Sequence, residues 1–429
     1  MFILTEMSGM VATMVCRAAA TALIAGSSFA AWGQNLPPEV QVGTADIMDH
    51  EFDWGRNGVN CPTCNFGAGN SRFAYIDNDN ILWVGYVDFS SGDFFPRNGK
   101  AVRIDTNATS AREIGNGPEW MLSERGSELM YNRWTDGLPK RAENMILGFA
   151  RMGNGSWVAG TVDGSQAQVL PVGSLDATDP IPSVHYQTYP KFGGGGRMFW
   201  RDVLPDSTGR RIPIISDDPA MTRRWVPGSR DIIITAPASL DAAGVVYKQV
   251  FLFHTETGAL DQLTFDPLDK LWAFMWKAPE YNNENLFFVV VGGTHLNVYR
   301  NLPRKNGAAR WRVINSITMP TATPYVSSPE PFVHNGRSWI FFSLAAIPDL
   351  HDFSATSLIA MTGIAPGSSA VKMLTSDSTP PRARRDPEYF ITANGPYLYY
   401  NRYIPATNSR PQINEGIFRV DTGLGPRTQ

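Results

Sequence analysis

A hairpin-like unit that recurs along the chain most constrains its fold. The stretches "PEWMLSERGSELMYNRW" from Pro118 and "PEYFITANGPYLYYNRY" from Pro387 both open with Pro-Glu-aromatic and reach Tyr-Asn-Arg-aromatic at the same spacing. Weaker copies begin at Asp217, Ala278 and Ser328, and the stretch from Asn70 has the same form without the proline. Each reads as a strand, a turn and a second apolar strand, which is the pattern of a β-hairpin.

Most of these hairpins are followed by two more short strands, for example "QVFLFHTETG" and "LDQLTF". Four strands that recur about every 40 to 60 residues are typical of the blades of a β-propeller. The 39 glycines, 31 prolines and 11% aromatic residues agree with many short strands joined by turns. We therefore predict an all-β chain that forms a single β-propeller of seven blades, with six blades as the alternative.

The two ends of the chain are expected to meet. The last blade offers only three strands, "PEYFITA", "YLYYNRY" and "GIFRVDTG", before a short polar tail. The segment "PEVQVGTA" from Pro38 is a suitable fourth strand. Its addition would close the ring and remove an exposed sheet edge.

The N-terminal segment has the features of a cleaved secretory signal. Reading from Met14, it contains Arg17, an apolar run over 18–25 and small-residue cleavage patterns at 28–30 or 31–33. We assign residues 1–33 to the signal and 34–429 to the propeller, in a periplasmic or secreted protein. The apolar run is shorter than the roughly 20 residues of a membrane span, so no span is expected after cleavage.

Charge and cysteine content exclude several other classes. A net charge of -3 with 18% charged residues gives no basic face for nucleic acid. Cys61 and Cys64 in "NCPTCN" are most simply a small-loop disulfide in an exported protein. No βαβ pattern surrounds them, as a redox pair would require, and a zinc site would need two further ligands. The sequence indicates no metal site and no particular cofactor.

Two resemblances concern single blades. The stretches "RWVPGSRDIII" and "VFLFHTETGALDQLT" resemble the repeat of TolB-like propellers, and "SPEPFVHNGRSWIFFS" is similar to blade openings of the arabinanase and xylosidase group of glycan-active propellers. The first resemblance implies a non-catalytic propeller that binds a protein or an envelope component. The second implies cleavage of a glycan.

The repeat also predicts where its charged residues lie. The first strand of a propeller blade lines the axis, so the Glu that starts it and the Arg that ends the second strand should share one face. We expect Glu119 with Arg133, and Glu388 with Arg402, on one rim near the axis. The same rim should hold Glu280, Glu330, Asp218, Arg201, Arg384 and Arg385. These charges could pair with one another or bind a ligand.

The leading hypothesis is an exported enzyme that cleaves a poly- or oligosaccharide, and the alternative is the TolB-like binding propeller. A glycoside hydrolase needs two carboxylates, for which the candidates are Glu119, Glu280, Glu330 and Glu388. A uronate lyase needs a cation for the substrate carboxylate and a base, for which the candidates are Tyr131, Tyr400 and His295. A glycan or another anionic ligand is the expected partner. The residues expected to bind it are Arg133, Arg402, Arg201, Arg384 and Arg385, which can grip carboxylates or sulfates, and Trp134, Tyr403 and Trp276, which can stack on sugar rings.

Overall fold

The computed structural model shows an all-β protein built from seven four-stranded antiparallel sheets. The described residues are 36–53, 71–94, 101–110, 117–154, 156–162, 168–188, 196–204, 207–216, 223–239, 244–303, 311–348, 355–365, 370–377 and 381–428. The predicted signal segment, Cys61, Cys64 and Asp218 lie outside them. In the described part of the chain, no helix is long and apolar enough to cross a membrane.

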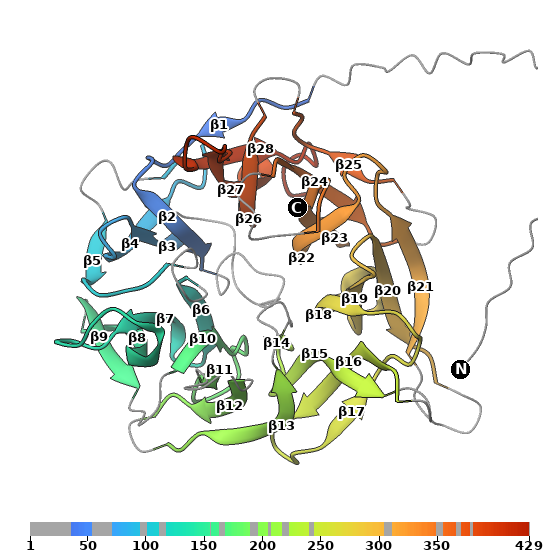
Figure 1. Cartoon of the computed structure of the whole chain (residues 1–429), viewed down its shortest axis with the longest axis horizontal. Helices are drawn as coiled ribbons and strands as arrows, with labels where there is room; N and C mark the ends of the chain where they lie inside the picture. The colour runs from blue at the N-terminus through green and yellow to red at the C-terminus, as the bar shows by residue number, and fades with distance from the viewer. Residues whose placement is uncertain are drawn as a thin grey trace, which may run out of the picture. The chain divides into compact units, whose positions relative to one another are not determined.

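The sheets follow one another around a ring as seven blades, which confirms the seven-bladed β-propeller (Figure 1). The strands of blades 1 to 3 are β2 (Ile47–Phe52), β3 (Ser71–Asp77), β4 (Leu82–Val87) and β5 (Val102–Asp105); β6 (Glu119–Ser123), β7 (Gly126–Trp134), β8 (Met145–Gly153) and β9 (Ser156–Val162); β10 (Gln168–Gly173), β11 (Ser183–Thr188), β12 (Gly196–Asp202) and β13 (Arg210–Ser216).

Blades 4 to 6 repeat this order. Their strands are β14 (Arg223–Trp225), β15 (Asp231–Ser239), β16 (Val246–His254) and β17 (Leu260–Gln262); β18 (Lys270–Ala278), β19 (Glu284–Val291), β20 (His295–Asn301) and β21 (Trp311–Thr318); β22 (Tyr325–His334), β23 (Arg337–Ala345), β24 (Ser357–Gly363) and β25 (Lys372–Met373). Two short 3-10 helices are η2 (Ala142–Asn144) and η3 (Pro279–Tyr281).

Blade 7 joins the two ends of the chain, as the sequence predicts. It contains β26 (Ala383–Thr392), β27 (Gly395–Ile404) and β28 (Ile413–Asp421), and its fourth strand is the N-terminal β1 (Val40–Gln41). Val40 pairs with Arg419 and Gln41 with Phe418 in antiparallel register. Because β1 has only two residues, side-chain packing must also hold this junction.

Aromatic packing supplies that support between blades 7 and 1. The ring of Phe52 on β2 lies 4.8 Å from Tyr399 and 5.5 Å from Phe390, measured between centroids. Phe94 stacks on Tyr399 at 5.5 Å. Buried aromatic pairs of this kind stabilise a fold by about 0.5 to 1.5 kcal/mol each beyond the burial of their area. The ring is therefore closed by an aromatic cluster as well as by strand pairing.

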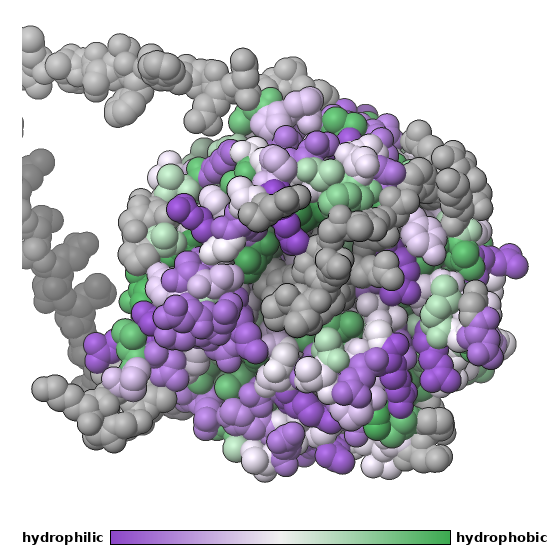
Figure 2. Space-filling view, turned by 180° about the vertical axis from the view of Figure 1, so that it is seen from behind, coloured by the Kyte–Doolittle hydropathy of each residue, from purple (hydrophilic) through white to green (hydrophobic). Residues whose placement is uncertain are grey.

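Two predicted hairpins occupy other positions in their blades. The stretch from Asn70 forms β3 and β4, the second and third strands of blade 1, whose innermost strand is β2. The stretch from Ala278 begins at the end of β18, where Pro279–Tyr281 form η3. The face turned away from the viewer of Figure 1 mixes hydrophilic and hydrophobic residues (Figure 2), in keeping with the small net charge.

Candidate functional site

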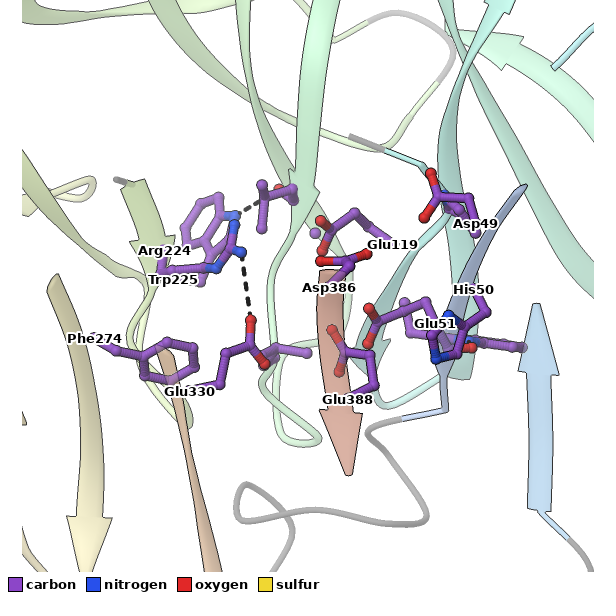
Figure 3. Close-up of a pocket in the computed structure, with 15 residues that line it drawn as sticks. Asp49, His50, Glu51, Glu119, Arg224, Trp225, Phe274, Glu330, Asp386 and Glu388 are labelled. Carbon is purple, nitrogen blue, oxygen red and sulfur yellow. Dashed lines mark hydrogen bonds and ion pairs between the residues drawn. The ribbon is translucent and has the colours of Figure 1, made fainter. Parts of the chain in front are cut away.

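A cavity of about 80 Å³ lies where the innermost strands of all seven blades converge (Figure 3). Its acidic lining comes from blades 6, 7, 1 and 2, which follow one another around the ring, and its apolar lining comes mainly from blades 3, 4 and 5. The acidic residues are Glu330, Asp386, Glu388, Asp49, Glu51 and Glu119; the apolar part includes Val172, Trp225 and Phe274; Arg224 and His50 complete the polar lining.

Three of the Pro-Glu pairs of the sequence form one local structure that turns a glutamate toward the axis. Gly117, Ser328 and Asp386 have positive φ angles of 65°, 43° and 52°. Each is followed by a proline and then by Glu119, Glu330 or Glu388. The ladder register shifts between Ser327 and Glu330 and between Arg385 and Glu388, as in a β-bulge. A bulge can redirect a side chain, and proline suits it because no N–H is lost from the ladder.

Blades 3 and 5 have the same irregularity with an apolar residue in place of glutamate. Leu170 and Trp272 have φ angles of 55° and 56°, and Val172 and Phe274 follow two residues later in the cavity wall. The counterpart of the catalytic candidates in blade 5 is therefore Phe274. Glu280 lies at the opposite end of β18, where it accepts hydrogen bonds from the backbone N–H and the hydroxyl of Ser338 at 2.8 and 2.9 Å.

Burial and charge set the protonation of the acidic side. Nη2 of Arg224 lies 3.4 Å from Oε1 of Glu330. Burial raises the pKa of Glu119 to about 8 and that of Glu330 to about 7, although Arg224 acts to lower both. Burial, together with the neighbouring carboxylates, raises the pKa of Glu388 well above its usual range. Near neutral pH the cavity therefore contains both protonated and ionised carboxyl groups.

His50 is held as a neutral imidazole with a defined tautomer. Its Nδ1 lies 3.1 Å from Oδ1 of Asn401, whose Nδ2 donates to the carbonyl of Ile47 at 3.1 Å. Since Oδ1 can only accept, Nδ1 carries the hydrogen and Nε2 offers a lone pair. Burial lowers the pKa of His50 to about 4, so the ring stays neutral at ordinary pH.

The asparagine of each Tyr-Asn-Arg segment ties its own blade to the innermost strand of the next. Asn401 binds Ile47 and His50 of β2, and Oδ1 of Asn132 accepts the N–H of Leu170 in β10 at 2.9 Å. Both contacts fall where the innermost strand of the next blade leaves its regular register. These asparagines support the cavity wall.

The arginines of the same segments are held by carboxylates outside the cavity. Arg133 contacts Asp105 at 2.7 Å and Asp136 at 3.1 Å. Arg402 contacts Glu39 and Glu415 at 2.8 Å each, and its guanidinium lies 3.3 Å from the centroid of the Phe418 ring. The ion pairs of both arginines thus differ from the expected combinations with Glu119 and Glu388.

The remaining candidates of the sequence lie away from the cavity lining. Three of them are held by hydrogen bonds: Tyr131 donates to Asp105 at 2.8 Å, Arg201 donates to Ser207 and to the carbonyl of Leu204, and Arg384 donates to Glu39 and to the carbonyl of Ser357. Arg385 stands opposite Asn401 in the ladder, and His295 is exposed at the start of β20. The side chains buried in the packing are Tyr400, Trp134, Tyr403 and Trp276. The cavity brings together Glu119, Glu330 and Glu388.

Five polar residues of the cavity were not predicted. Asp386 directly precedes a Pro-Glu pair, and "DHEF" contains Asp49, His50 and Glu51 on the innermost strand of blade 1. Arg224 stands beside Arg223 in "TRRW". A search for short strands ahead of the hairpin from Asn70 could have found "DHEF", because that blade otherwise lacks an innermost strand.

Comparisons with known proteins agree on the fold. The sequence matches no protein-family model and no curated protein. Among solved structures, the chain is similar to the Cps50 (Swd1) β-propeller domain of Myceliophteria thermophila, with 10% identity, a TM-score of 0.47 and coverage of 89% of this chain and 99% of that one.

Two polysaccharide lyases are also similar in structure. One matches with 9% identity, a TM-score of 0.45 and coverage of 92% of this chain and 100% of the other. The second, an ulvan lyase bound to a glucuronate–rhamnose sulfate unit, matches with 9% identity, a TM-score of 0.43 and coverage of 87% and 96%. At such low sequence identities and TM-scores, these structural similarities indicate neither the activity nor the ligand of this protein.

Proposed function

We propose that the axial cavity is the catalytic site of an exported carbohydrate-active enzyme that hydrolyses a poly- or oligosaccharide. The observation that carries this proposal is the gathering of buried carboxyl groups with unequal pKa values in one cavity. Glu119, with a pKa of about 8, holds a proton at neutral pH, while Glu330, with a pKa of about 7, is partly ionised beside Arg224. Such a difference in pKa supplies an acid and a base for one reaction.

The roles follow from the two environments. Protonated Glu119 would donate to the leaving glycosidic oxygen, and ionised Glu330 would activate water or attack the sugar carbon. Hydrolysis is favoured over uronate elimination because the arginines expected to neutralise a uronate, Arg133 and Arg402, are held by carboxylates. The cavity of about 80 Å³ is smaller than the roughly 300 Å³ at which ligand pockets usually begin, so only one group of a chain would enter it.

A glycan panel tests this proposal. The protein is incubated with neutral, amino and acidic oligosaccharides while new reducing ends and the absorbance of unsaturated products are followed. Glu119→Gln and Glu330→Gln should each lower hydrolysis at least about 100-fold, in the range typical of general acid–base catalysis. The matched control is Glu256→Gln, which alters an exposed carboxylate after β16 and should leave the rate unchanged.

The other outcomes separate the competing functions. Unsaturated products would show that the enzyme is a lyase and not a hydrolase. No product from any glycan, with unchanged folding of the protein, would contradict the enzyme and leave the TolB-like binding propeller as the function to pursue.

A further inference from the structure

We propose that the cavity recognises a positively charged substrate group, the ammonium of an amino sugar, on its acidic side. This inference rests on the proposed function because it names the substrate class of the same site. It is the opposite of the anionic ligand that the arginine-rich repeat predicts. Four features of the cavity carry it: the charge of its lining, two buried acceptor atoms, its divided wall and the spacing of its carboxylates.

The lining holds a surplus of acidic groups. Six carboxyl groups from β2, β6, β22 and β26 face one lining arginine, Arg224 from β14. Arg223, the next residue, is buried and donates to Gln187 and to the carbonyl of Leu170. Buried carboxylates in surplus are costly unless they take up protons or a cation. A bound ammonium can replace those protons, whereas a uronate or sulfate would add to the repulsion.

Two deeply buried acceptor atoms have no hydrogen-bond partner among the described residues. One is Oε2 of Glu330, in a residue that is 8% exposed, and the other is Nε2 of His50, in a residue that is 1% exposed. Both residues line the cavity, and Figure 3 shows them on either side of Glu388. An unpaired buried acceptor costs about 1 to 3 kcal/mol. An ammonium group, with three donors and no acceptor, matches such atoms.

The opposite wall is apolar and partly aromatic. Trp225, Phe274 and Val172 line it. Aromatic faces attract a nearby cation. An ammonium group that enters the cavity of about 80 Å³ therefore meets hydrogen-bond acceptors on one side and aromatic faces on the other, and the rest of the sugar stays outside.

An organic cation fits this lining better than a metal ion. In the part of the chain that the structure describes, no three His, Cys, Asp or Glu side chains converge as metal ligands. Metal ions need oxygen or nitrogen ligands within about 2.0 to 2.6 Å. An ammonium hydrogen-bonds at longer distances, typically about 2.7 to 2.9 Å for charge-assisted bonds, and tolerates the wider spacing of these side chains.

Direct binding tests this inference without relying on catalysis. Tryptophan fluorescence, to which Trp120 and Trp225 in the wall should contribute, and calorimetry at pH 6.5 are used with D-glucosamine, N-acetyl-D-glucosamine and D-glucuronate. We expect glucosamine to bind at least 10-fold more tightly than its acetylated form, and glucuronate not to bind. Glu330→Gln should weaken glucosamine binding at least 10-fold, and Glu256→Gln should not change it. Glu388→Gln serves as a second variant if Glu330→Gln unfolds.

The outcomes are distinguishable from those of the proposed function. Selective glucosamine binding without cleavage of any glycan would support the inference and contradict the hydrolase. Cleavage of glycans with equal affinity for the amino and acetylated sugars would support the hydrolase and contradict the inference. Displacement of glucosamine by millimolar CaCl2, with direct calcium binding in calorimetry, would make this a metal site and overturn the inference.

Discussion

At the scale of single residues, Arg224 is the centre of charge in the cavity. Burial acts to lower its pKa, but Glu119, Glu330, Glu51 and Glu388 outweigh this effect, so the pKa is raised and the guanidinium stays charged. One cation cannot neutralise all of these carboxylates. The excess is relieved by protonation, which is why the pKa values of Glu119, Glu330 and Glu388 rise.

The first prediction concerns the effect of pH on stability. An acid whose pKa is raised by folding binds its proton more tightly in the folded state, so unfolding becomes easier as pH rises toward the folded pKa. Glu119 and Glu330 have pKa values of about 8 and 7 in the folded protein, against 4.5 as the ordinary value. The free energy of unfolding should therefore fall between pH 6.5 and 8, by at most about 1.4 kcal/mol per pH unit for each proton.

Denaturant unfolding at several pH values measures this slope. Glu119→Gln should flatten the slope because the amide does not titrate, whereas Glu256→Gln should leave it unchanged. The window starts at pH 6.5 because the pKa of buried His50, about 4, makes the opposite contribution at lower pH. Equal slopes in the wild type and Glu119→Gln would contradict the raised pKa of Glu119.

The second prediction separates backbone strain from crowding at Gly117. A Cβ at this position would collide with the carboxylate of Asp49, and the φ of 65° is unfavourable for any other residue. Gly137 has a similar φ of 76° but open space around its Cβ position. Gly137→Ala should cost about 1 to 2 kcal/mol from strain alone. Gly117→Ala should cost clearly more in thermal unfolding; equal losses would show that the cavity wall moves freely to admit the methyl group.

At the scale of secondary-structure elements, the bulged innermost strands determine which side chains reach the axis. Ser328 and Asp386 adopt positive φ just before a proline, a combination that side chains rarely adopt. Strained backbone of this kind persists where neighbouring structure holds it in place. The asparagines of the Tyr-Asn-Arg segments provide such contacts for β2 and β10, and the N–H of Leu170, itself at positive φ, donates to Asn132.

The third prediction tests this support. Asn401→Ala removes the partner of His50 Nδ1 and one of two amide donors to the Ile47 carbonyl, which keeps Asn414, so the buried imidazole N–H left without a partner should lower stability by about 1 to 3 kcal/mol. Asn394→Ala is the control, because its side-chain amide donates to the carbonyl of Ser90 at an exposed turn. Differential scanning calorimetry should show a small change for the control. A small change for Asn401→Ala as well would mean that the strands are held by other contacts.

The sequence predicts only part of the arrangement of the innermost strands. Pro-Glu marks Glu119, Glu330 and Glu388 as residues that approach the axis, but in β22 and β26 the proline lies at a bulge inside the strand and not at its entry as expected. The same pair misleads at Glu280, where it forms a 3-10 turn. Nothing in "KLWAF" announces the positive φ of Trp272, which aligns Phe274 with the glutamates, since that conformation is imposed by tertiary packing. The carboxylates that bind Arg133 and Arg402 could not be predicted, because these contacts join segments that are distant in the sequence.

At the scale of the whole molecule, the N-terminal segment closes the ring through charge as well as through strand pairing. Glu39 precedes β1 and accepts from Arg384 and from Arg402 at 2.8 Å each. Arg384 is 2% exposed and Arg402 is only partly exposed. One carboxylate at the start of the fold thus binds two arginines from strands near its end, and blade 7 depends on residues far apart in the sequence.

The last prediction concerns this junction. Glu39→Ala leaves Arg384 and Arg402 without a shared carboxylate, and Arg402→Ala removes its contacts with Glu39, Glu415 and the Phe418 ring. Each change should lower the stability of the propeller by about 1.5 to 3 kcal/mol, since it removes charge-assisted hydrogen bonds while the remaining charges keep other partners, Arg402 with Glu415 and Arg384 with Asp377. The double variant should lose less stability than the sum of the two single losses, because the two residues share one interaction.

The control is Arg141→Ala, at an exposed ion pair 3.9 Å long, which should change stability by less than about 0.5 kcal/mol. Thermal unfolding of the four variants measures these losses. Strictly additive losses would mean that Glu39 and Arg402 stabilise the ring independently of each other. Loss of glycan binding by Arg402→Ala with unchanged melting would instead assign Arg402 to a ligand site, because a residue that closes the ring must act through stability first.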